Sequence, residues 1–167
     1  KTAPDYENPV SAEGSNVYDV AVTATDDAGN ASTQNVTVSV EDIDEIAPSI
    51  TGLTGDAGAT DSTVTISENS SVVYNFTADE SVVWSIGGGA DEELFIIDSS
   101  TGELSFKTSP DYENPGSSEG SNEYVVAVTA TDATGNASTQ NVTVSVEDVD
   151  EIAPSITGLT GDAGATD

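Results

Sequence analysis

Several residue types are absent from this 167-residue chain, and each absence removes a class of chemistry. Without cysteine, the chain can form neither a disulfide framework nor a zinc–thiolate site. Without histidine, it lacks the commonest general base and a frequent metal ligand. No apolar run approaches the roughly 20 residues that a membrane-spanning helix needs, so we expect no membrane insertion within this segment. The residues from Lys1 onward show no signal-peptide pattern, and any secretion signal is expected outside them.

Positive charge is almost absent as well. The chain contains 31 acidic residues against two lysines and no arginine, which gives a formal net charge of −29. Nucleic acid is therefore excluded as a partner, because phosphate binding depends on lysine and arginine, and an anionic membrane surface is disfavoured. Such a charge destabilises a compact state unless counter-charge is supplied. A disordered acidic tail is one interpretation, but regularly spaced runs of β-branched and aromatic residues argue against it.

The chain contains an internal repeat with a period of 106 residues. Residues 1–61 align with residues 107–167 at 53 identical pairs out of 61, and the differences fall at positions 3, 10, 12, 17, 19, 27, 28 and 43. This period has the length of a domain, whereas solenoid units run to about 20–50 residues. We therefore expect a tandem array in which 1–46 is the C-terminal half of one repeat, 47–152 is a complete repeat, and 153–167 starts the next.

Short strands are predicted throughout the complete repeat, separated by turn signals. They are Thr63–Ser67, Val72–Ala78, Val82–Ile86, Leu94–Asp98, Glu103–Lys107, Glu123–Thr131 and Thr139–Glu147. In the last two, valines at every second position share one face, and threonines and serines share the other. The pattern predicts an all-β fold, a seven-stranded antiparallel Greek-key β-sandwich of immunoglobulin-like type with Trp84 in its core. The segment Gly87–Asp91 is interpreted as a flexible loop.

Acidic side chains gather at three places in the complete repeat. Asp111 and Glu113 occupy alternate positions, so in extended chain both point the same way. Four acids occur among the five residues from Glu147 to Glu151, and Asp132 ends a predicted strand beside a Gly-Asn turn. Clustered carboxylates repel one another unless a cation joins them. Hard oxygen ligands on irregular loops favour Ca²⁺, which takes six to eight of them.

Seven motifs, in this order and spacing, resemble those of bacterial cadherin-like repeats, which form long tandem arrays in large secreted adhesins of the RTX type. The motifs are Ile66–Asn69, Phe76–Glu80, Leu94–Asp98, Thr101–Leu104, Pro110–Glu113, Ala130–Asp132 and Asp148–Pro154. The resemblance covers the complete repeat and both partial ones. It implies a cadherin-like sandwich with Ca²⁺ between consecutive domains.

The resemblance also implies which residues would bind the ions. The base of the preceding domain, the acidic linker and the top of the following domain each supply ligands. At the first junction the matching residues are Asp5, Glu7, Asp42, Asp44 and Glu45 with Asp79 and Asp132. At the second junction they are Glu68, Asp111, Glu113, Asp148, Asp150 and Glu151, and a following repeat supplies the rest.

Two motifs depart from the usual cadherin pattern. Cadherins commonly carry Asp-x-Asp where this chain has Asp79-Glu80-Ser81, and the linker usually reads Asp-x-Asn-Asp-Asn, whereas here it is Asp148-Val149-Asp150-Glu151-Ile152. One bridging carboxylate is therefore absent or replaced. We expect two or three ions at each junction.

The function predicted from these features is mechanical. Calcium would rigidify the linkers and make the chain an extender or stalk of an extracellular or cell-surface adhesin or fibre, with neighbouring repeats as its partners. One alternative is a calcium-dependent adhesive module that binds carbohydrate or a like domain directly. Another is a filament subunit that completes its neighbour's β-sandwich by strand pairing between copies, because the predicted strands Asn16–Thr25 and Thr33–Glu41 leave exposed edges. Catalysis is not expected.

Overall fold

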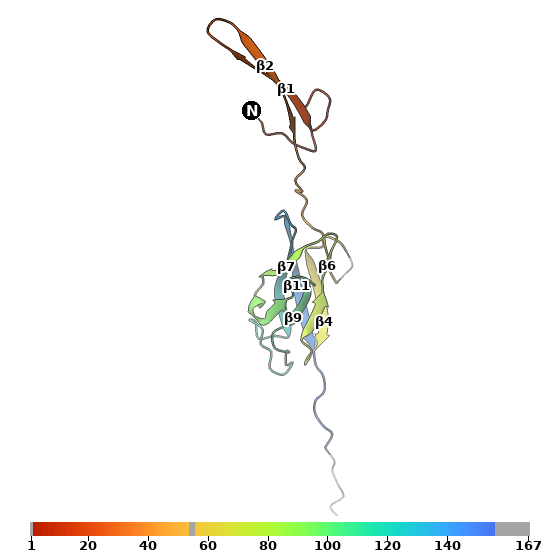
Figure 1. Cartoon of the computed structure of the whole chain (residues 1–167). Coiled ribbons are helices and arrows are strands. Elements are labelled where there is room, and N and C mark those ends of the chain that lie inside the picture. The colour runs from red at the N-terminus through yellow and green to blue at the C-terminus, as the bar shows by residue number, and fades with distance from the viewer. Residues whose placement is uncertain (1, 54–55, 156–167) are drawn as a thin grey trace, which may run out of the picture. The chain divides into compact units, whose positions relative to one another are not determined.

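The computed structural model describes residues 2–53 and 56–155, which form two compact units with a boundary between Ile46 and Ala47 (Figure 1). The first unit contains one antiparallel hairpin of β1 (Val17–Thr25) and β2 (Ala31–Ser39). Most of the expected start of a further repeat, from residue 156 onward, lies outside the described residues. Within those residues, no helix has the length and apolar character to cross a membrane.

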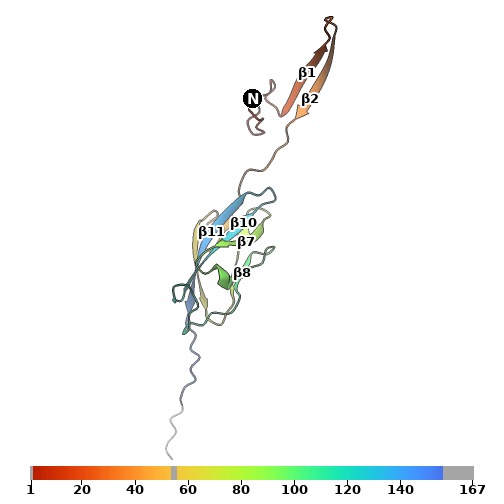
Figure 2. The same ribbon diagram turned by 90° about the vertical axis from the view of Figure 1, so that its left-hand side faces the viewer.

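The second unit is a β-sandwich. One sheet has the order β4 (Asp61–Ser67), β11 (Ala137–Glu147), β10 (Glu123–Thr131), β7 (Val83–Gly88), and a second has the order β5 (Val72–Asn75), β9 (Glu103–Phe106), β8 (Phe95–Ile97). A short pair joins β3 (Ile50–Thr51) to β6 (Thr77–Ala78), and a single 3₁₀ turn, η1 (Glu92–Leu94), precedes β8. Figure 2 shows β7, β10 and β11 side by side in the larger sheet.

The predicted all-β sandwich is confirmed, with two differences in detail. β4 pairs with β11 in parallel, so the sandwich is not purely antiparallel. The predicted strand Val72–Ala78 is divided at Phe76, whose backbone N–H donates to Gly102 O instead of to a neighbouring strand. The division lets the chain leave the sheet of β5 and pair with β3 through β6.

The core lies between the two sheets, where the predicted alternation is borne out. Tyr124, Val126, Val128 and Ala130 of β10 are buried, and so are the inward valines of β11. Aromatic rings fill the space opposite them: Phe95 and Phe106 have centroids 4.2 Å apart, and Tyr124 packs edge-on against Phe106 at 5.0 Å. Trp84 is only 5% exposed and belongs to this core.

The prediction of a flexible loop at Gly87–Asp91 is wrong. Gly87 and Gly88 extend β7, and Asp91 is buried. Its carboxylate accepts hydrogen bonds from the backbone N–H groups of Ser118, at 2.6 Å, and Val125, at 2.8 Å. A Cβ on Gly89 would lie 2.5 Å from Val125 O, so glycine is needed for this close approach. The segment therefore fastens the start of β10 to the rest of the sandwich.

Candidate metal site

Glu68 organises one end of the sandwich. It follows β4 directly and is only 4% exposed. Its Oε2 accepts a hydrogen bond from the backbone N–H of Tyr112 at 2.7 Å, and its Oε1 accepts one from Val149 at 2.8 Å. These two backbone donors lower the pKa of Glu68, because they stabilise its charged form. One carboxylate thus holds the Asp111–Glu113 loop and the acidic linker together.

Three further carboxylates converge on Glu68. One oxygen each from Glu68, Glu113, Asp148 and Glu151 lie within 4.8 Å of one another, and we call this group the complete cluster. A hydrogen bond from its own backbone lowers the pKa of Glu113, but burial and the negative charges of Glu68, Glu151 and Asp148 raise the pKa overall. At Glu113, burial and the repulsion between neighbouring carboxylates therefore outweigh the stabilising hydrogen bond.

Asn69 is a member of this site that the sequence interpretation missed. It is the single non-glycine residue with positive φ (63°) in the described parts of the chain. Its side-chain amide donates to Glu151 Oε1 at 2.7 Å, and its backbone N–H donates to Pro110 O at 3.0 Å. An asparagine two positions after the end of the predicted strand Thr63–Ser67 was the available signal, because asparagine tolerates left-handed backbone better than most residues.

A second group occupies the corresponding place in the first unit. Oxygens of Glu7, Asp42 and Glu45 lie within 4.8 Å of one another, and we call this group the partial cluster. It corresponds to Glu113, Asp148 and Glu151 after a shift of 106 residues. A hydrogen bond from its own backbone lowers the pKa of Glu7, but burial, a hydrogen bond with Asp42 and the charges of Glu45 and Asp42 raise it overall. Residues 2–46 contain no counterpart of Glu68 or Asn69.

Four predicted ligands flank these clusters without joining them. Asp5 and Asp111 each cap a turn, accepting from the backbone N–H of Asn8 and Asn114 at 3.0 Å. Asp44 and Asp150 accept from the N–H two residues later, and Asp150 lines a pocket of about 240 Å³ together with Glu113, Asp148 and Glu151. Of these four acids, Asp150 thus borders the complete cluster.

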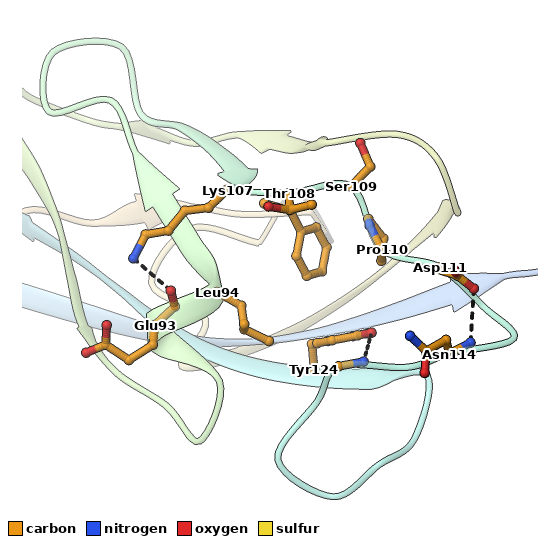
Figure 3. A pocket seen from close by; sticks show the side chains of 11 residues that line it. Glu93, Leu94, Lys107, Thr108, Ser109, Pro110, Asp111, Asn114 and Tyr124 are labelled. Carbon is orange, nitrogen blue, oxygen red and sulfur yellow. Dashed lines mark hydrogen bonds between the residues drawn. The ribbon is translucent and has the colours of Figure 1, made fainter.

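Asp111 also borders a larger pocket, of about 560 Å³ (Figure 3). Leu94, Phe106, Pro110 and Tyr124 form much of its lining. Figure 3 shows the Asp111 carboxylate turned to the backbone of Asn114. The Asp111 carboxylate therefore borders this pocket while it accepts the hydrogen bond of its own turn.

The two remaining predicted ligands lie away from the complete cluster. Asp79 accepts from the backbone N–H of Ser49 at 2.7 Å. Asp132 follows β10 at the turn end of the β10–β11 hairpin, where Thr131 pairs with Ala137. The linker acids follow β11 at the other end, where Glu123 pairs with Ser145. Asp132 and the linker acids therefore lie at opposite ends of the hairpin. Nine residues of β-strand span about 30 Å. The repeat thus carries acids at both ends.

The loop around Asp132 is organised by its carboxylate. Oδ1 accepts from the backbone N–H groups of Thr134, Gly135 and Asn136 at 2.6–2.8 Å, and Oδ2 accepts from the Asn136 amide at 2.8 Å. Burial raises the pKa of Asp132, but the hydrogen bonds from Asn136 and Thr134 outweigh it, so the pKa is lowered. The carboxylate is therefore ionised at neutral pH.

A family model of the cadherin domain matches residues 49–147, which is more than half of the chain. The chain belongs to the cadherin family. This agrees with the sandwich, in which the parallel β4–β11 pair closes the larger sheet. The match does not extend to the acids beyond Glu147, which adjoin the matched domain.

Solved cadherin structures resemble this chain in fold. Human CDH23 EC21-23 is 19% identical with a TM-score of 0.51, over 82% of this chain and 45% of that one. The protocadherin gammaB4 extracellular domain is 22% identical with a TM-score of 0.51, over 80% of this chain and 21% of that one. Mouse clustered PcdhgC3 EC1-3 is also 22% identical, with a TM-score of 0.50, over 80% of this chain and 44% of that one. This chain spans less than half the length of each of them. No curated protein sequence matches the chain significantly.

Cadherin domains are extracellular adhesion modules that typically bind Ca²⁺ and have no enzymatic activity. The complete cluster fits such an ion by its chemistry. Every side chain of the cluster offers a hard carboxylate oxygen, and the oxygens converge within 4.8 Å. A bound Ca²⁺ would offset the repulsion that raises the pKa of Glu113.

Proposed function

We propose that this chain is a calcium-stiffened extender segment from the tandem array of a large secreted adhesin of bacterial type. The observation that carries the proposal is the complete cluster, because it draws four carboxylates together where the sandwich passes into its linker. A stalk needs a stiff joint between domains, and a cation can supply it by binding acids from both sides of the joint.

Each group of acids has its own part in this proposal. Glu68, Glu113, Asp148 and Glu151 would hold the ion, and Asp111 and Asp150 would add ligands from the flanking loops. The counterparts of Asp79 and Asp132 in a following repeat would complete the site. At the first junction, Asp79 and Asp132 themselves would join the partial cluster, Asp5 and Asp44. Ca²⁺ supplies positive charge and a flexible coordination shell. Extracellular calcium modules bind with dissociation constants on the order of 10⁻⁴–10⁻³ M.

Small-angle X-ray scattering tests the proposal on the whole chain. We expect the maximum dimension to increase and the profile to stiffen when millimolar Ca²⁺ replaces a chelator. A Glu7→Gln, Asp42→Asn variant should lose most of this response, because these acids adjoin the linker between the two units, whereas Glu119→Gln, which changes an exposed acid outside both clusters, should keep it. Identical scattering with and without Ca²⁺ would refute the extender function.

The structure weakens the alternative of direct carbohydrate binding. Trp84 is the single tryptophan of the chain and could have served as a stacking platform for a sugar ring. It is buried and packs against Phe76, with ring centroids 6.1 Å apart. An extender that presents other domains is therefore favoured over a module that binds sugar itself.

A further inference from the structure

The linker that follows β11 is fixed to the sandwich at two points. The backbone N–H of Val149 donates to Glu68 Oε1 at 2.8 Å, and the Asn69 side-chain amide donates to Glu151 Oε1 at 2.7 Å. Glu68 and Asn69 directly follow β4, which runs parallel to β11, so both strands end at the same edge of the sheet. The backbone N–H of Glu68 also donates to Glu147 O at 3.0 Å. The two residues after β4 therefore lie beside the linker as it leaves the sheet.

These two residues are themselves anchored in the sandwich. Glu68 is only 4% exposed, and its second oxygen accepts from the backbone N–H of Tyr112 at 2.7 Å. Asn69 donates its backbone N–H to Pro110 O at 3.0 Å. The Asn122 side-chain amide, just before β10, donates to Tyr112 O at 2.9 Å. The attachment of the linker thus continues into the loop before β10.

None of these hydrogen bonds needs a cation, because each one joins an N–H donor of the protein to an oxygen of the protein. The carboxylates of the complete cluster repel one another, but Glu113, Asp148 and Glu151 are exposed, so water and salt weaken the repulsion. Hydrogen bonds to the buried Glu68 carboxylate are charge-assisted and are not weakened in this way. Each Glu68 oxygen also keeps a second lone pair, so an ion can still bind to it.

The linker is limited from its other side by the start of a sandwich. Ala47 and Pro48 are buried in the second unit, and Pro48 is less than 2% exposed. They correspond to residues 153–154 after a shift of 106 residues. In the tandem array on which the proposed function rests, a following repeat would bury 153–154 in the same way. Ile152, which is 85% exposed, then lies between two fixed segments.

We propose that Glu68 and Asn69 form a calcium-independent clamp that holds the linker on its own sandwich as far as Glu151, and that Ile152 is the hinge between repeats. The clamp is a property of this chain alone, whereas the role of the hinge rests on the proposed function. Glu68 and Asn69 are then positioning residues, which hold Glu151 and the loop around Tyr112 where an ion can meet them. Calcium has to immobilise one residue rather than the whole acidic linker.

Backbone NMR relaxation of the whole chain in EDTA tests the clamp in the absence of calcium. We expect order parameters of about 0.8 for Val149 and Glu151, close to those of a rigid strand, and a first drop below about 0.6 at Ile152. Val149 is the best reporter, because its counterpart at position 43 is isoleucine and the two signals can be distinguished.

Variants of Glu68 test which group holds the linker. Glu68→Ala should lower the order parameter of Val149 below about 0.6. It should also speed hydrogen exchange of the Tyr112 amide by about tenfold or more, because a charge-assisted bond is lost. Glu68→Gln keeps one acceptor oxygen and should release only one of the two amides. Glu147→Gln is the matched control: it removes an exposed carboxylate beside the linker but no acceptor of these bonds, and should change neither signal.

Three outcomes would overturn the proposal. A flexible Val149 in the parent chain in EDTA would do so whether or not the variants fold. An equally ordered Val149 in Glu68→Ala would show that β11 alone orders the linker. A first drop in order before Ile152 would remove its assignment as the hinge. All these measurements are made without calcium, so an intact clamp in a chain whose scattering ignores calcium would refute the extender function and leave the clamp standing.

Discussion

The two hairpins of this chain have nearly the same sequence and the same register but opposite environments. β10–β11 is the centre of a four-stranded sheet with its inward valines buried, whereas the same valines of the β1–β2 hairpin are exposed. Pairing of the two strands therefore arises locally, from β-branched alternation and a tight turn in which Asp26 accepts from the backbone N–H groups of Ala28 and Asn30. Burial arises from the covering sheet.

This difference separates two contributions to stability. Full burial of one valine contributes roughly 1.5–3 kcal/mol relative to leaving it exposed. An isolated two-stranded hairpin has no such contribution and is marginal in water. The same substitution in the two hairpins should therefore have very different effects.

The largest effect is expected for valine-to-alanine substitutions at matched positions. Val144→Ala should lower the free energy of unfolding of the sandwich by about 2 kcal/mol, because it leaves a cavity in a packed core. Val38→Ala, its counterpart, should leave that free energy within about 0.5 kcal/mol of the parent value. Urea unfolding followed by Trp84 fluorescence measures both. Equal effects would mean that both hairpins are buried in solution.

The second effect concerns the two acidic clusters, which differ by the presence of Glu68. Replacing it with glutamine should lower calcium affinity at the complete cluster by about tenfold or more, because the loop and the linker both bind to this carboxylate. Isothermal titration calorimetry measures the loss, with Glu119→Gln as the control. Glu7→Gln in the partial cluster should leave the affinity of the complete cluster unchanged, and a matching loss there would contradict the separation of the two clusters.

Much of the fold could be predicted from local pattern. Period-2 alternation located β10 and β11 and assigned their buried faces, and turn residues separated the shorter strands. Pattern could not show that β4 joins β11 in parallel, because that pairing links residues about 80 positions apart. It also could not show that one copy of the hairpin is covered and the other is not.

The candidate site was predictable to a different degree. The resemblance to cadherin-like repeats named the acids of the complete and partial clusters as candidate ligands, but the burial of Glu68 depends on backbone donors from two distant segments. The structural role of Asp91 was missed because a glycine-rich run is typical of a loop. The role becomes visible only in the structure, where the Asp91 carboxylate accepts a hydrogen bond from Ser118, which precedes β10. The ligand assignments from the family pattern remain predictions.

A smaller effect is expected at Asn69, which is present at the complete cluster alone. Asn69→Gly removes the amide that donates to Glu151 but accepts the positive φ, so the calcium-free melting temperature should change little. Calcium affinity should fall a few-fold, because Glu151 is no longer held in place. Asn69→Ala should lower both quantities, since alanine is strained at this φ. Unchanged affinity in the glycine variant would show that the amide does not position Glu151.

The smallest effect separates the units by their response to acid. Hydrogen bonds from the Ser100 side chain and the backbone N–H groups of Thr101 and Ser100 lower the pKa of Asp98 from 3.8 to about 2. A lowered carboxyl pKa stabilises the folded state above the unfolded value, and this stabilisation is lost as the pH falls from about 4 to about 2. Asp98→Asn should therefore flatten the decline of sandwich stability across this window, measured by urea unfolding at several pH values. The β1–β2 hairpin has no counterpart of Asp98, so its amide exchange should be the same in the parent and the variant, and an altered pattern there would show that the two units titrate together.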